Sequence, residues 1–479
     1  MDTLWAGAIR AGRLAAAAGA VLAALAGTGR RAAAEPGEAT PRARGAHALT
    51  TVGLYVSPPG ADRARYLDFY RACGYNYLEF CDGGFGQRPD LLARYYAGMA
   101  DAVRAARAKG FRVWILLLAG MRQWKGPGEA GSAGTFSALD ADLRRERLAC
   151  IRRAVEALND ADGFVFFAGD PGGDPEGRST VKDCMVFARE VRGIVRASAP
   201  RVGFVVNLWA VAEWAGFPSP FGLEFWRKQA ALTREVAAEP DLLGPACGVA
   251  FSLDGYYRSL TLACYAAAGL SPDRYPTAAA VRDLRRRGVK AVLGWPYFLV
   301  DEVDDGFITP NNVASGGQAG SEARYIRAIV ERGRALELDG LVANATYVAA
   351  EALNLWTFGQ MCRHPRLSPA AALDGFARIV ADGPTCGTLA RVLRFMENHG
   401  NWQHSLPEAY RLRGLANPGV ASAGDALRLL DTVVPRHAPP IALPEEPARY
   451  LARVRARLEA IAAGRIGGVA PILGAPKAP

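Results

Sequence analysis

A pair of aspartates follows one of the most apolar stretches of this sequence. The segment "GFVFFAGDPGGDP" places Asp170 and Asp174 directly after the apolar residues 164–168, among glycines and prolines. Asp, Gly and Pro are common turn residues, so a simple turn is one interpretation. The other is that a buried strand delivers two carboxylates to a reactive site, because paired carboxylates carry out general acid/base catalysis.

Acidic, amide and aromatic residues also follow five other apolar runs. These runs end without a lysine and the chain has no paired histidines, which argues against a Schiff-base enzyme and a metal hydrolase. Carboxylates that act at an acetal centre, together with amides and aromatic rings that hold a pyranose, are typical of sites that bind and cleave sugars. Besides Asp170 and Asp174, the candidates are Glu79, Asp82, Asn207, Trp209, Asp254, Tyr256, Trp295, Tyr297, Asp301, Asn344 and Tyr347.

The order of the residues suggests a role for each group. We expect Asp170 to be the general acid/base, because it stands directly at the end of its run. Its partner is Asp174 or Asp254, and the other candidates are expected to line a sugar pocket. Any one aspartate alone after a strand is more often a turn former or a helix N-cap than a catalyst. Their joint occurrence on six runs favours a glycoside hydrolase-like enzyme; the alternative is a barrel that binds a glycan without cleaving it.

The elements that must position these residues follow a regular order. Eight short apolar runs alternate with longer amphipathic stretches, which predicts parallel strands buried on both faces and separated by helices. Eight such units favour a closed (β/α)8 TIM barrel over an open, doubly wound sheet. The runs are "TVGLYV" from residue 51, "YNYLEF" from 75, "FRVWILLL" from 111, "GFVFFA" from 163, "VGFVVNL" from 202, "GVAFSL" from 248, "KAVLGW" from 290 and "DGLVAN" from 339.

The strand pattern ends near residue 365. We therefore expect a catalytic barrel over 48–365, a helical C-terminal region over 366–465, and a flexible tail over 466–479 that is rich in glycine, proline and alanine.

The first 34 residues have the layout of a secretory signal peptide. Arginines precede the apolar run "LAAAAGAVLAALAG", and small residues follow it in "RAAAE". We expect cleavage near Glu35, a secreted or periplasmic protein, and no stable membrane insertion afterwards. The formal net charge of +10 falls to about +7 without residues 1–34, which hold four arginines and one aspartate. The remaining basic residues are dispersed, so no nucleic-acid partner is expected.

Cysteine and histidine usage argues against a metal site. The chain has 8 cysteines and 5 histidines, without a C-x-x-C or H-E-x-x-H motif. No metal and no cofactor is expected, and the expected partner of the protein is an oligo- or polysaccharide. Disulfides and buried free thiols are both compatible with the cysteine positions.

Two segments in the region 290–380 resemble known glycoside hydrolases. "GWPYFLVDE", followed by "DGLVANATYVAAEALNLWTFGQMCRHPRLSPAAALDGFA", is similar to the last two barrel strands of the bacterial hyaluronidase/O-GlcNAcase type of β-N-acetylglucosaminidase. "ALNLWTFGQMCRHPRLS" also resembles the end of the α-glucuronidase barrel. The resemblance implies a TIM-barrel glycosidase. The adjacent acid doublet of the glucosaminidases is absent here, since Asp170 and Asp174 stand four residues apart.

Overall fold

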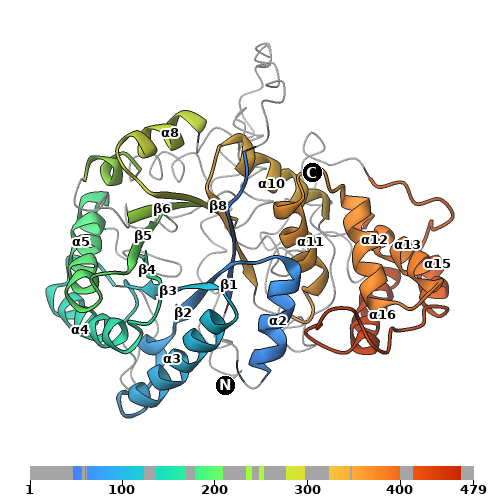
Figure 1. Cartoon of the computed structure of the whole chain (residues 1–479), viewed down its shortest axis with the longest axis horizontal. Helices are drawn as coiled ribbons and strands as arrows, with labels where there is room; N and C mark the ends of the chain where they lie inside the picture. The colour runs from blue at the N-terminus through green and yellow to red at the C-terminus, as the bar shows by residue number, and fades with distance from the viewer. Residues whose placement is uncertain are drawn as a thin grey trace, which may run out of the picture.

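Eight parallel strands form a closed barrel in the order β1-β2-β3-β4-β5-β6-β7-β8. This architecture comes from a computed structural model, which describes residues 47–56, 60, 62–122, 136–168, 178–208, 233–239, 247–252, 277–296, 323–345, 348–399 and 414–464. Helices surround the barrel, and further helices lie to one side of it (Figure 1). The predicted TIM-barrel fold is confirmed.

Each predicted run overlaps one strand. The strands are β1 (Thr51–Val56), β2 (Tyr77–Asp82), β3 (Arg112–Leu118), β4 (Gly163–Phe167), β5 (Gly203–Asn207), β6 (Cys247–Ser252), β7 (Ala291–Trp295) and β8 (Gly340–Ala345). The second run was expected to begin at residue 75, whereas β2 begins at Tyr77. The difference arises because Gly74 ends the preceding helix in the left-handed conformation, with φ of 104°, and Tyr75 then packs among helices.

Some of the helices around the barrel begin at a side-chain cap. Asp140 caps α4 through a hydrogen bond from the Leu143 backbone N–H, and Thr180 forms a capping box with Asp183 at the start of α5. The helices of this layer are α2 (Arg63–Cys73), α3 (Leu92–Ala108), α4 (Ala141–Ala157), α5 (Val181–Ser198), α8 (Ala278–Arg286), α10 (Ala323–Ala335) and α11 (Ala352–Arg363).

Three pairs of neighbouring strands are joined by the same kind of side-chain hydrogen bond at their N-terminal ends. The residue before β2, β4 or β8 is Asn76, Asp162 or Asp339, and its side chain accepts a hydrogen bond from the second residue of the preceding strand. The distances from the backbone nitrogens of Val52, Val113 and Val292 are 2.9, 2.8 and 2.8 Å. Because buried backbone N–H groups need partners, these short polar side chains fix the register at the base of the barrel.

Glycines at the base of the barrel make room for two large rings. The rings of Tyr77 and Trp114 lie with centroids 5.9 Å apart inside the barrel. A Cβ atom on Gly163 would lie 2.4 Å from the Trp114 ring, and one on Gly53 would lie 2.8 Å from Tyr77 Cδ1. The large residues on β2 and β3 are therefore matched by glycines on β1 and β4.

The substitution Gly163→Ala tests this packing. We expect it to lower the free energy of unfolding by about 1–3 kcal/mol, because the added methyl group overpacks the ring of Trp114. The matched control is Gly193→Ala on the exposed face of α5, where an added Cβ meets nothing within 4 Å. That change should be neutral or stabilise by up to about 1 kcal/mol. Denaturant unfolding of both variants measures the difference, and equal stabilities would contradict the packing argument.

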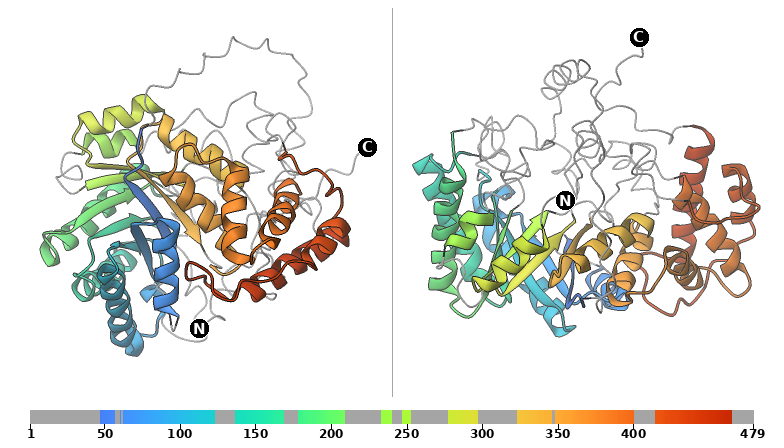
Figure 2. Two further views of the ribbon diagram at one scale, coloured as in Figure 1. Left: turned by 45° about the vertical axis from the view of Figure 1, so that its right-hand side comes forward. Right: turned by 90° about the horizontal axis from the view of Figure 1, so that it is seen from above.

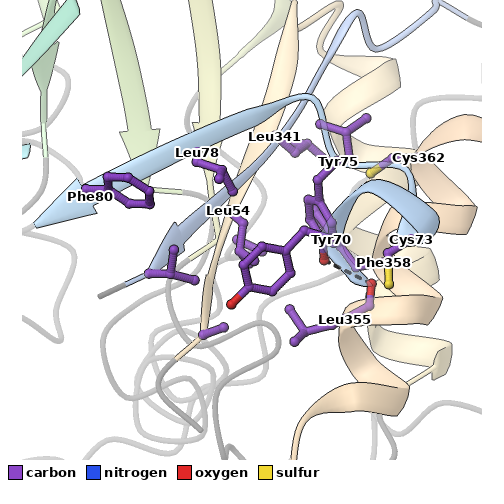
Figure 3. Packing of buried hydrophobic residues seen from close by; sticks show 14 of the residues in the cluster. Leu54, Tyr70, Cys73, Tyr75, Leu78, Phe80, Leu341, Leu355, Phe358 and Cys362 are labelled. Atoms are coloured by element: carbon purple, nitrogen blue, oxygen red, sulfur yellow. Dashed lines mark hydrogen bonds between the residues drawn. The ribbon is translucent and has the colours of Figure 1, made fainter. Parts of the chain in front are cut away.

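A second layer of core lies between the barrel and its helices. In Figure 3, Tyr75 projects between α2 and α11, where its ring stacks on Phe358 with centroids 6.1 Å apart. The Tyr75 hydroxyl donates a hydrogen bond to the Leu355 carbonyl at 2.9 Å. Cys73 and Cys362 lie in the same cluster as buried free thiols, and burial raises the pKa of both. The sequence left disulfides and buried free thiols open, and Cys73 and Cys362 are buried free thiols.

The chain continues after the barrel as helices that pack beside α10 and α11 (Figures 1 and 2). They are α12 (Pro369–Val380), α13 (Thr385–Asn398), α15 (Ala423–Leu430) and α16 (Pro447–Ala462). Glu397 of α13 is fully buried and caps the start of α10, accepting hydrogen bonds from the backbone N–H groups of Ala323 and Arg324 at 2.7 and 3.1 Å. It also pairs with the buried Arg324 guanidinium at 2.9 Å. One carboxylate thus joins the later helices to the barrel.

The predicted signal peptide (1–34) and flexible tail (466–479) lie outside the described residues. Within the described ranges, every helix is too short or too polar to cross a lipid bilayer.

Candidate active site

The strand register arranges the inward-pointing side chains in levels. Every second side chain of a strand points into the barrel, and alternate tilted strands contribute to one level. Following the paired residues around the barrel, Tyr55, Asn207 and Trp295 share one level in the half nearer the C-terminal strand ends. Asn344 lies one level closer to the C-terminal ends of the strands, and Glu79 lies one level closer to their N-terminal ends.

Aromatic rings and amides come together inside the barrel, at the levels nearer the C-terminal ends of the strands. Trp295 is 1% exposed, and its ring centroid lies 5.6 Å from that of Tyr55 and 5.6 Å from that of Phe167. Asn207 and Asn344 are also buried. The structure therefore brings together three predicted residues from β5, β7 and β8. The sequence analysis missed Tyr55 and Phe167, because they lie within strands; their alternation with outward-facing neighbours is the signal that could have identified them.

Glu79 places a carboxyl group inside the barrel. The Tyr77 hydroxyl donates to Glu79 Oε2 at 3.3 Å, while Oε1 has no hydrogen-bond partner among the described residues. Burial raises the pKa of Glu79 from 4.5 to about 8, and the hydrogen bond from Tyr77 acts in the opposite direction. Glu79 is therefore protonated at neutral pH, so that it can donate a hydrogen bond as well as accept one. Its inward direction agrees with a place in the predicted pocket.

Asp82 requires a correction. It was expected to contact substrate, but it shares the outer face of β2 with Leu78 and Phe80 and points toward the helices. Its carboxylate pairs with Arg147 of α4 at 3.3 Å, and both side chains are almost completely buried. It also accepts a hydrogen bond from the Tyr96 hydroxyl at 3.3 Å. The reason is strand alternation: the inward residues of β2 are odd-numbered, and Asp82 is the last residue of the strand instead of a residue beyond it.

The remaining predicted site residues lie outside the described residues. They are Asp170, Asp174, Trp209, Asp254, Tyr256, Tyr297, Asp301 and Tyr347. Several of them come shortly after the end of a described strand in the sequence. Asp170 stands three residues after the last residue of β4, and Tyr297 stands two residues after the last residue of β7. The two proposed acid/base partners of Asp170 therefore stay predictions.

Metal ions in proteins are commonly held by clusters of acidic, histidine and cysteine side chains. Across the described ranges, no group of three or more such residues is suitably arranged to hold an ion.

Comparison with known proteins leaves the assignment at the level of the fold. The sequence matches no protein-family profile and no curated protein. Solved structures that resemble the chain include the O-GlcNAc hydrolase of Thermobaculum terrenum, which is 11% identical with a TM-score of 0.44. The aligned region covers 80% of this chain and 74% of the hydrolase chain. Another is a GH138 enzyme targeting pectin rhamnogalacturonan II. This enzyme is 10% identical with a TM-score of 0.47, and the aligned region covers 74% of this chain and 44% of the enzyme chain.

Morphinone reductase is also similar, at 13% identity and a TM-score of 0.37, covering 65% of this chain and 86% of its own. At such identities the likeness concerns the fold alone. The chain is a (β/α)8-barrel protein, and its chemistry has to be argued from its own residues.

Proposed function

We propose that this protein is a glycoside hydrolase that cleaves glycosidic bonds of a polysaccharide or glycoconjugate by carboxylate acid/base catalysis. The observation that carries the proposal is the convergence of Glu79, Asn207, Trp295 and Asn344, from four strands, on the inside of one closed barrel. Amides, an aromatic ring and a neutral carboxyl are groups that suit a polyhydroxylated ligand. The fold adds support, because TIM-barrel active sites lie at the C-terminal strand ends.

In this proposal Asp170 protonates the leaving-group oxygen, and Asp174 or Asp254 supplies the second carboxylate. The second carboxylate acts either as the nucleophile or as the base that activates water. Trp209, Tyr256, Tyr297, Asp301 and Tyr347 join the buried amides and Trp295 in holding the sugar. Export through a cleaved signal over residues 1–34 would bring the enzyme to extracellular or periplasmic glycans.

A panel of aryl glycosides and of bacterial and plant polysaccharides tests the proposal. We expect one class to release reducing sugar or the aryl group at a rate that scales with the concentration of the protein. Binding of a glycan without any product would favour the second candidate, a glycan-binding barrel, for which the buried amides and rings alone are sufficient. Neither binding nor cleavage across the panel would contradict both.

A further inference from the structure

The turn that follows β2 is held in place by several side chains. This turn comprises residues 83–86 and includes the short helix η1 (Gly84–Gly86). The backbone N–H of Gly83 donates to the Tyr95 hydroxyl at 2.7 Å, and that of Gly84 donates to Asp82 Oδ1 at 2.9 Å. A Cβ atom on Gly84 would lie 2.2 Å from the Tyr96 hydroxyl, so the position has no room for a side chain.

A buried ion pair lies beneath this turn. Arg147 donates through Nη2 to Asp82 Oδ2 at 3.3 Å and to the carbonyl of Leu118, the last residue of β3, at 3.2 Å. Its guanidinium carbon is 5.9 Å from the centroid of the Phe85 ring, which is within the range of a cation–π contact. Burial of an ion pair costs desolvation free energy, so the pair by itself is weak support for stability. Its geometry instead fixes three elements, the ends of β2 and β3 and the ring of Phe85.

The ring of Phe85 lies at the barrel interior. It is partly buried and packs against the interior cluster formed by Tyr77, Cys81, Leu116, Leu118, Met121, Val165, Phe167, Val205, Leu293, Trp295 and Val342. Phe85 follows the C-terminal end of β2, so it reaches this cluster from the end of the barrel where active sites of this fold are found. A partly exposed ring at that end, already in contact with the Arg147 guanidinium and the interior cluster, is suited to contact a ligand. Such neighbours restrict the side chain before binding, so that less conformational freedom is lost on binding.

We propose that Phe85 forms an aromatic wall of the sugar site, packing against the apolar C–H face of a pyranose ring, and that Arg147 is a positioning residue that holds this wall. The inference rests on the proposed function and adds a binding residue that the sequence analysis did not identify. Asp82 then contributes to the site indirectly, through the turn and through Arg147.

Steady-state kinetics of Phe85 variants on the substrate found by the glycan panel test the wall. We expect Phe85→Ala to raise KM about 3- to 10-fold with kcat nearly unchanged, because an aromatic contact of this kind stabilises ground state and transition state alike. Phe85→Trp should restore a KM close to that of the wild type. A purely structural role for Phe85 would lower stability without this split between KM and kcat.

The positioning role is tested with Arg147→Met combined with Asp82→Asn. The double variant removes both buried charges together, because Arg147→Met alone leaves a buried unpaired carboxylate and endangers folding. The turn does not need the charge of Asp82, since the amide oxygen introduced by Asp82→Asn can still accept from the Gly84 backbone. We expect KM to rise about 2- to 5-fold, with kcat retained. The matched control is Arg112→Met, which removes a guanidinium 5.9 Å from the Tyr77 ring at the opposite end of the barrel and should leave KM unchanged.

The outcomes separate the two proposals. If the wild-type protein cleaves a glycan and Phe85→Ala leaves KM unchanged, the wall is wrong and the hydrolase function stands. If Phe85→Ala raises KM but the double variant behaves like Arg112→Met, the positioning role of Arg147 is wrong. If the wild type neither binds nor cleaves any glycan, both the function and the wall are overturned. Circular dichroism and thermal unfolding of every variant establish that the proteins compared are folded.

Discussion

Replacement of Asp170 by asparagine is expected to lower the rate of glycoside hydrolysis by ~10²–10⁴-fold while leaving the fold intact. Asparagine has the same shape as aspartate but cannot transfer a proton to the leaving group. An acid catalyst also needs a raised pKa, and an apolar setting together with a nearby carboxylate favours one. The strand before Asp170 supplies the apolar setting, since every residue of β4 is buried. The measurement is kcat/KM on the substrate identified by the panel.

Parallel variants give this experiment its controls. Asp174→Asn and Asp254→Asn distinguish the two candidates for the second carboxylate, because only the true partner should cause a loss comparable to that of Asp170→Asn. If Asp170→Asn hydrolyses substrate at the wild-type rate with unchanged thermal stability, Asp170 is a turn residue, for which the expected cost is about 1 kcal/mol or less. The acid would then have to be sought after β2 or β6.

The second large effect concerns the pH dependence of stability conferred by Glu79. Burial raises the pKa of this carboxyl from 4.5 to about 8 in the folded protein. Between these two values the unfolded chain releases the proton while the folded protein retains it, so stability falls as the pH rises and the loss is complete above about 8. In this window the unfolding equilibrium constant should rise by up to about tenfold per pH unit.

Glu79→Gln should remove that dependence, because glutamine is neutral at every pH and similar in size. We expect wild type and variant to differ little below pH 4.5, and the variant to become progressively more stable than the wild type up to about pH 8. Denaturant unfolding across this range measures the gap. Glu156→Gln, at an exposed position on α4, is the matched control and should follow the wild-type curve. Parallel curves for wild type and Glu79→Gln would show that Glu79 is ionised in the folded protein.

The barrel could be predicted because its signal is repeated eight times along the chain. Apolar runs such as "GFVFF" have to be buried on both faces, and their alternation with helices leaves few topologies open. Local boundaries were less certain: Tyr75 looks like the first residue of a strand, yet it packs between helices because Gly74 turns the chain.

The candidate site was only partly predictable, because side-chain direction depends on where each strand ends. Asn207 and Trp295 end their strands on the inward side, whereas Asp82 ends β2 on the outward side. A shift of one residue reverses the face, and the sequence of "LEFCDGG" does not reveal that shift. Phe85 could not be predicted for another reason: its place depends on Arg147, 62 positions away along the chain.

The carboxylate of Glu397 has a consequence for how this protein can be divided. It caps the first turn of α10, although it belongs to a helix that follows the last strand of the barrel. A gene shortened after the barrel would encode Arg324 without its counter-ion and an α10 whose first two backbone amides have lost their cap. Recombination that exchanged the barrel alone between related genes would meet the same obstacle. The barrel and the helices that follow it are therefore expected to be inherited as one unit. The end of the eighth strand is not a point at which the chain can be divided without losing the contacts of Glu397.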